Sequence, residues 1–150
     1  MKNALYKWFK VKNGVPFGAA IGLKVRPNFQ FKNTIIDACQ GQGFKGQGMI
    51  IQVPEIGFES WKQGAKIGLE YCFSMVNDFW TVELVTIEGL VSDSNPTIIG
   101  YVAIRAFFDS IGQELDNDKI EQLEAVVFKS WERQHLDHLP DFYEMEFFKN

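Results

Sequence analysis

The chain has 150 residues, of which 46% are hydrophobic and 15% aromatic, and its formal net charge is −4. Disordered chains are poor in aromatic and β-branched residues, so this composition excludes disorder of the whole chain. The length suits a single domain spanning residues 1–150. Lysines interrupt the first ten residues, and no run approaches the roughly 20 apolar residues that span a bilayer. We therefore expect a cytoplasmic protein with no secretory signal and no membrane partner.

The charge is divided unevenly along the sequence. Residues 1–66 hold ten Lys and Arg against three acids, a balance of +7, whereas residues 67–150 hold five against sixteen, a balance of −11. Such an asymmetry is typical of a surface that attracts a charged partner. The alternative, which we favour, is that the two halves interleave in one domain and their charges mix on its surface.

The first third of the chain predicts strands. Residues 6–11 alternate aromatic and basic side chains, which favours an edge strand protected by lysines. A turn at Asn13-Gly14 leads to a strand over residues 17–25, whose small residues allow close packing. A second strand is predicted over residues 29–38, where β-branched residues cluster, before a glycine-rich turn and a short apolar run over residues 49–53.

From Phe58 to Phe73 the apolar residues fall at helical spacing. Residues 80–87 return to alternation and predict a strand covered on both faces. Residues 92–96 end in Asn-Pro and predict the start of a helix that runs to Ile111.

A last helix is predicted from Asp118, with Glu121 as its capping-box partner, and Pro140 ends it. Its apolar stripe includes Leu123 and Val127. The aromatic tail over residues 142–148 is expected to dock as a strand or lie in a groove.

A literal G-x-G-x-x-G pattern occurs at Gly41, Gly43 and Gly46. A dinucleotide site needs this pattern to open a helix, but a strand-like run follows it here. Gln47 also stands where a phosphate-binding loop requires Lys. The pattern therefore favours a flexible turn over nucleotide binding.

The inventory of reactive side chains predicts no catalytic, metal or cofactor site. His135 and His138 could share a helix face, but a zinc site needs three or four ligands. Cys39 and Cys72 are interpreted as reduced, buried small hydrophobes, and no oriented nucleophile is recognisable. We expect a protein that is not an enzyme, and an unrecognised catalytic site is the least favoured alternative.

Two classes of partner stay open. Aromatic side chains interleaved with lysines can stack on bases while the cations meet phosphates, although an edge strand explains the same residues. The candidate RNA- or partner-binding residues are Lys7, Lys10, Lys12, Arg26, Lys32, Gly43 and Lys45. A sequence pI near 5.2 is low for a dedicated RNA binder, so a protein partner is favoured over a ribosome or ribosomal RNA.

Residues 15–111 resemble domain IV of elongation factor G and the related ribosomal protection proteins. The resemblance is carried by an aromatic-Gly strand over residues 17–27 and a helix over residues 58–73. It continues in a strand that ends at an acidic-Gly turn, residues 82–89, and in a last helix that contains Ala103 to Phe107 after Asp93-Ser94-Asn95.

The resemblance implies an α+β fold like domain 2 of ribosomal protein S5, with one mixed sheet and helices packed on it. It also implies tip loops that approach the ribosomal decoding centre. Residues 112–150 would add a helix and an aromatic tail outside this core. The chain contains no GTPase domain, the loop before the last helix has no His, and Pro16 and Ala19 replace the polar residues that flank the family's first aromatic-Gly pair.

Overall fold

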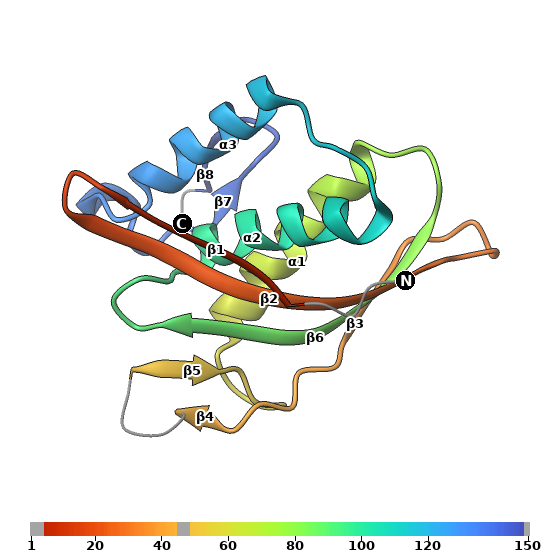
Figure 1. Cartoon of the computed structure of the whole chain (residues 1–150), viewed down its shortest axis with the longest axis horizontal. Coiled ribbons are helices and arrows are strands. Elements are labelled where there is room, and N and C mark those ends of the chain that lie inside the picture. The colour runs from red at the N-terminus through yellow and green to blue at the C-terminus, as the bar shows by residue number, and fades with distance from the viewer. Residues whose placement is uncertain (1–4, 45–48, 149–150) are drawn as a thin grey trace.

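A computed structural model describes residues 5–44 and 49–148 of the chain. The elements in chain order are β1 (Leu5–Lys12), β2 (Val15–Pro27), β3 (Thr34–Asp37), β4 (Gly43–Phe44), β5 (Ile50–Gln52), α1 (Glu59–Ser74), β6 (Trp80–Leu90), α2 (Pro96–Ile111), α3 (Asn117–Lys129), the 3-10 turn η1 (Arg133–His135), β7 (Pro140–Asp141) and β8 (Glu146–Phe147). The expected α+β class is confirmed: helices cover one face of a mixed sheet (Figure 1).

The β1–β2 hairpin forms where the sequence predicts it. Asn13 and Gly14 both have positive φ, 52° and 78°, which is the geometry of a two-residue hairpin turn that matches the twist of the strands. Gly18 on β2 lies directly beneath the ring of Phe9 on β1, where a Cβ would overlap ring atoms. The small residues of β2 therefore do allow the close packing expected of them.

Strand β6 is the centre of the sheet. One edge pairs antiparallel with β2, while the other is shared by β3, which pairs in parallel with residues 81–84, and β5, which pairs antiparallel with residues 88–90. Side chains on the inner face, such as Ile21, Leu84 and Ile87, are fully buried beneath the helices. The sheet order is β1-β2-β6-β5-β4, so β1 is the expected edge strand.

Helices α1 and α2 cross at glycines. A Cβ added to Gly68 would lie 2.9 Å from the carbonyl carbon of Gly100, and one added to Gly100 would lie 2.7 Å from the carbonyl oxygen of Gly64. Helix α2 begins as predicted: the side chain of Asn95 accepts a hydrogen bond from the Ile98 N–H, and Pro96 is the first helical residue. This close crossing lets α2 be buried between the sheet, α1 and α3.

The C-terminal third differs from the prediction in two places. Helix α3 ends at Lys129, well before Pro140, and the chain continues through η1 into the β7–β8 hairpin. The prediction of a capping box is also wrong, because the N-cap residue is Asp116 and no side chain caps the helix. The aromatic tail does dock: Phe142 is fully buried and its ring centroid lies 5.9 Å from that of Tyr71 on α1.

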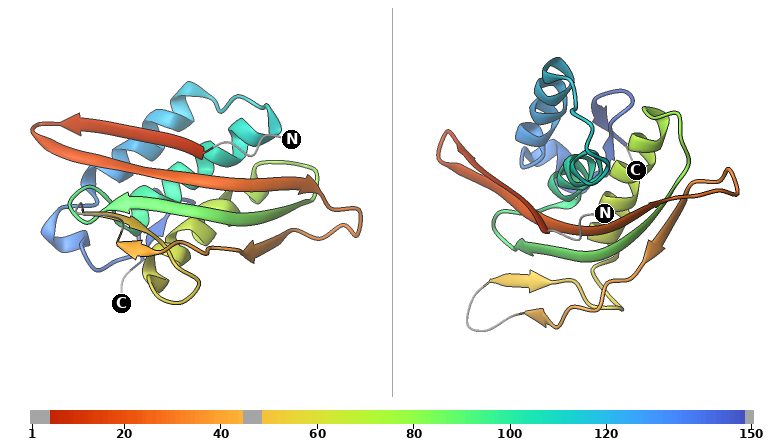
Figure 2. Two further views of the ribbon diagram at one scale, coloured as in Figure 1. Left: turned by 60° about the horizontal axis from the view of Figure 1, so that its bottom comes forward. Right: turned by 45° about the vertical axis from the view of Figure 1, so that its right-hand side comes forward.

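Two further expectations are corrected on the sheet. The predicted strand over residues 29–38 is a strand only over Thr34–Asp37, and residues 28–33 form a loop. Strand β6 is covered by helices on its inner face alone, and Glu83, Thr86 and Glu88 on the outer face are partly exposed. Figure 2 shows this outer face without a helix among the residues that the structure describes. In the same residues, no helix combines the length and the apolar character needed to cross a membrane.

Candidate interaction surface

The loop between β2 and β3 is fixed by two asparagines. The Asn28 backbone N–H donates to the Phe79 carbonyl oxygen at 2.9 Å, and its side-chain nitrogen lies 3.0 Å from the Thr81 hydroxyl. The Asn28 side-chain oxygen accepts from the Gln30 N–H, an arrangement in which Asn closes a turn. At the other end of the loop, the Asn33 side chain accepts from the Trp80 N–H at 2.9 Å. The loop is therefore held to the start of β6 on both sides.

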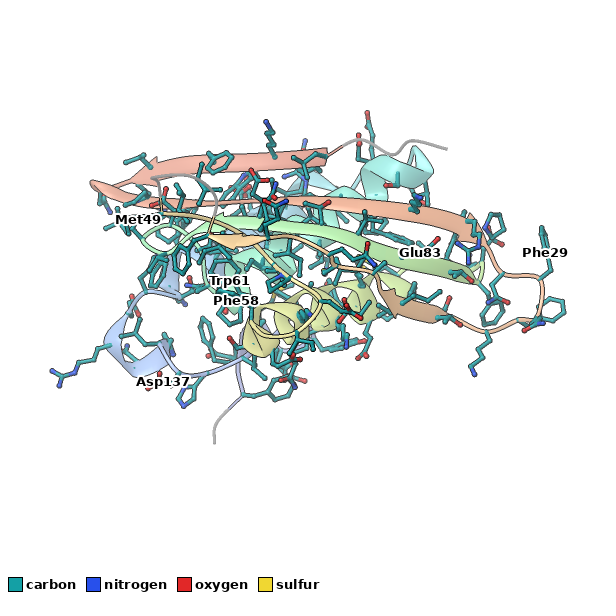
Figure 3. All side chains as sticks on the ribbon, turned by 90° about the horizontal axis from the view of Figure 1, so that it is seen from below. Phe29, Met49, Phe58, Trp61, Glu83 and Asp137 are labelled. Carbon is teal, nitrogen blue, oxygen red and sulfur yellow. The ribbon has the colours of Figure 1, made fainter. Side chains whose placement is uncertain are left out.

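This fixed loop displays two phenylalanine rings to solvent. Phe29 is 87% exposed and Phe31 is 78% exposed. Phe31 has a φ of +55° and its ring meets that of Phe79 edge-to-face at 5.9 Å, so Phe79 supports it from below. Figure 3 shows Phe29 at the far end of the molecule, with its side chain pointing away from the body. We call Phe29, Phe31 and Phe79 the aromatic tip.

Charged side chains of both signs lie beside the aromatic tip in the sequence and on the strands β2 and β6 that lead to it. Arg26 and Glu83 form an ion pair across the outer face at 2.6 Å. Lys32 and Asp78 are exposed on the loops that flank the rings. The tip therefore combines an apolar centre with a polar rim, the arrangement that is common at protein–protein interfaces.

The structure does not gather the predicted basic residues on one surface. Lys7 points to the outer face of β1, while Lys10 and Lys12 point to the opposite side, toward α3. Lys10 lies 3.3 Å from Glu124, and the Lys12 ammonium lies 4.3 Å from the centroid of the Phe128 ring.

The other predicted residues lie elsewhere. Arg26 and Lys32 lie close together along the chain, at the base and on the loop of the aromatic tip. Gly43 begins β4 with a φ of +77°, a conformation that favours glycine, and Lys45 lies outside the described residues. Gly46 also lies outside the described residues, and the next described element is the strand β5, whereas a dinucleotide site requires a helix.

The two thiols are buried, as expected. Burial, together with the neighbouring Asp37 carboxylate, raises the pKa of Cys39 to about 12. Burial alone raises the pKa of Cys72 well above its usual value. Since the thiolate is the nucleophilic form, neither thiol is in a reactive state at neutral pH.

A buried lysine ties α1 to the sheet. Lys62 is 2% exposed, and its ammonium contacts Asp37 Oδ2 at 3.0 Å and the Glu55 carbonyl oxygen at 2.6 Å. Burial raises the pKa of Asp37, but the Cys39 N–H and the Lys62 ammonium outweigh burial, and the net shift is downward. The pair is a structural link between β3 and α1.

The histidines lie at the C-terminal end of the fold. His135 stacks on the ring of Phe147 with centroids 4.2 Å apart and lies in the turn η1, so it shares no α-helix with His138. Within residues 5–44 and 49–148, no three or more His, Cys, Asp or Glu side chains are grouped so as to hold a metal ion.

Sequence reasoning missed the aromatic tip because Phe29 and Phe31 alternate with Gln30 and Lys32. That alternation is the usual pattern of a half-buried strand. The available contrary signal was Asn28 and Asn33 at the two ends of the segment, because Asn is typical of turns.

The fold and the tip define a class: an α+β protein that presents a fixed aromatic projection at one end of its sheet. Comparison with known proteins assigns it no further, because no family model, no curated protein and no solved structure matches the chain.

Proposed function

We propose that this chain is a non-catalytic protein-binding module and that Phe29 and Phe31 are its anchor residues. The observation that carries the proposal is the exposure of both rings, 87% and 78%, on a loop held by side chains at both ends. Exposed rings on a mobile loop would lose conformational entropy on binding. A loop whose ends are already held to the sheet avoids part of that cost, and this is the property that an anchor needs.

The energetics fit a protein partner with an apolar pocket. Each phenyl ring transferred from water into such a pocket contributes about 1.5–3 kcal/mol. Aromatic residues at the centre of an interface commonly dominate its binding energy, while the polar rim mainly excludes water. Lys32, Asp78 and the Arg26–Glu83 pair form that rim around the aromatic tip.

The order and pairing of the elements support a more specific assignment of the fold. We propose that it is the ribosomal protein S5 domain 2-like arrangement that the resemblance to elongation factor G domain IV implies. The order β2–β3–α1–β6–α2 follows the order of elements that the resemblance implies, with β4 and β5 inserted before α1 and β1 preceding the residues that carry the resemblance. The parallel pairing of β3 with β6 around α1 supplies the β-α-β unit.

A second candidate function is ribosome or RNA association. The observation that favours it is that Lys7 and Phe9 lie two residues apart on the outer face of β1, and Phe9 is 57% exposed. A lysine beside an exposed ring can contact a phosphate while the ring stacks on a base. Such binding would weaken steeply as salt is raised.

The experiment compares capture of cellular proteins by the wild-type chain, by Phe29→Ser/Phe31→Ser, and by Phe44→Ser as the matched control. Phe44 is 62% exposed on β4, so its replacement also removes an exposed ring, but far from the tip in the fold. We expect a partner retained by the wild-type chain and the control and lost by the double variant, with affinity reduced about a hundredfold or more.

Thermal unfolding of the three proteins controls for folding. Equal capture by all three would overturn the role of the tip. Co-sedimentation with ribosomes at low and high salt, with Lys7→Glu/Phe9→Ser as the variant, tests the second candidate. Salt-sensitive binding lost in that variant would replace the protein-partner proposal by the ribosomal one.

A further inference from the structure

A hollow of about 330 Å³ lies where the start of β1 meets the C-terminal half of α2 and the segment that leads to α3. This volume falls within the range of small-molecule sites, which begins at roughly 300 Å³. Its lining combines one cation, acidic groups and apolar side chains. The residues that the argument uses are Tyr6, Arg105, Phe108, Glu114, Leu115 and Ile120.

Arg105 is held in place at the wall of this hollow. Its Nη1 donates to the Tyr101 hydroxyl at 2.7 Å, and its Cζ lies 5.8 Å from the ring centroids of both Tyr6 and Tyr101. The side chain nevertheless keeps 25% of its surface exposed. A guanidinium has five N–H donors in a rigid plane, so one that is fixed and partly exposed is suited to bind a carboxylate.

Arg105 belongs to a network of charged side chains of both signs. The Glu124 carboxylate accepts from the Tyr101 hydroxyl at 2.6 Å, and it lies 3.3 Å from Lys10 and 3.8 Å from Arg105. Lys10 and Arg105 therefore share the Glu124 carboxylate. Tyr101 stays neutral, because burial and its hydrogen bond to Glu124 raise its pKa far above the usual value.

The rest of the lining is complementary to a ligand that carries one negative and one positive charge. Glu114 is exposed and lines the hollow, and Asp109 lines it one helical turn after Arg105. The apolar side chains of Phe108, Leu115 and Ile120 complete the lining. A ligand with only negative charge would be repelled by this acidic part of the wall.

We propose that the hollow binds a free α-amino acid with an apolar side chain. The α-carboxylate is bound by Arg105, the ammonium by Glu114, and the side chain by Phe108, Leu115 and Ile120. The proposal goes beyond the protein-binding function and does not rest on it, because the aromatic tip contributes no residue to the hollow.

The test is a titration of the isotope-labelled full chain with L-leucine, followed through its backbone amide NMR signals at constant pH and ionic strength. We expect saturable shifts confined to residues 105–120 and the start of β1. L-Leucine amide lacks the carboxylate and 4-methylpentanoate lacks the ammonium, and each is expected to bind about tenfold more weakly or worse.

Variants separate binding from folding. Arg105→Gln should abolish the shifts, but it also removes a contact of Tyr101, so Glu114→Gln is the decisive variant because the side chain is exposed. It should weaken L-leucine about tenfold and leave 4-methylpentanoate unchanged or tighter. The proposal is overturned if L-leucine gives no saturable shift at millimolar concentration, if its amide binds equally well, or if Glu114→Gln binds like the wild-type chain.

Discussion

Helices α1 and α2 approach each other backbone to backbone at glycines, which makes Gly68→Ala a demanding test of the packing. A Cβ at Gly68 would lie 2.9 Å from the carbonyl carbon and 3.1 Å from the Cα of Gly100, and nearer still to the Gly100 carbonyl oxygen. These neighbours are backbone atoms of a buried helix. They cannot turn away as a flexible side chain can, so the two helices must separate.

Two opposing effects set the size of the change. Replacing Gly by Ala inside a helix stabilises it by about 1 kcal/mol through backbone entropy. Overpacking of a well-packed core costs about 1–3 kcal/mol, and a clash with backbone belongs at the upper end of that range. The expected result is a net destabilisation of about 2 kcal/mol, which lowers the melting temperature by roughly 4–8 °C in a domain of this size.

The assay is equilibrium urea unfolding, followed by tryptophan fluorescence, of the wild-type chain, Gly68→Ala and Gln63→Gly. Gln63 is exposed on the same helix. Its replacement by Gly therefore measures the effect of helix propensity on the free energy of unfolding without a change in packing. If Gly68→Ala is as stable as the wild-type chain or more stable, the helices do not approach as closely as the structure shows, and the reasoning fails.

Two predictions concern the charges and thiols around β3. Because the pKa of Asp37 is lowered in the folded state from a usual value of 3.8, its ion pair with Lys62 contributes stability above that pH and loses it as the pH falls through the folded pKa. The stability difference between the wild-type chain and Asp37→Asn should therefore be largest near neutral pH and shrink in acid; a difference independent of pH would contradict it. Cys39 and Cys72 should resist iodoacetamide at pH 8 until the chain is unfolded in urea, and rapid alkylation of the native protein, read by intact mass, would show that the thiols are accessible.

Local signals in the sequence predicted much of the fold correctly. Asn13-Gly14 specified the first hairpin because few residues other than Asn and Gly adopt positive φ readily. Asn95-Pro96 specified the start of α2 because one residue supplies the capping oxygen and the other needs no N–H partner. Such features depend on neighbours in the chain, so they are visible without the structure.

The predictions from sequence were wrong at positions where tertiary contacts determine the local structure. Alternation predicted a strand over residues 29–38, but its first part is a loop: the Asn28 N–H donates to the Phe79 carbonyl oxygen, and the Asn33 side chain accepts from the Trp80 N–H. The last helix was expected to reach Pro140, yet it ends at Lys129, and the following chain packs through its aromatic tail instead. In both cases the residues concerned contact parts of the chain that are far away in the sequence.

Sequence motifs could not reveal either proposed site, because each site depends on the tertiary structure. The aromatic tip depends on exposure, and a phenylalanine in a strand-like pattern is ordinarily assigned to the core. The hollow depends on Tyr6 from β1, Arg105 from α2 and Glu114 from the following segment, which are brought together only when α2 packs across the sheet. The uneven charge of the two sequence halves does not produce one basic surface, because Lys10 of the basic half pairs with Glu124 of the acidic half and Arg26 pairs with Glu83. Charges from the two halves of the sequence thus mix on the surface of one domain, which is the interpretation that the sequence analysis favoured.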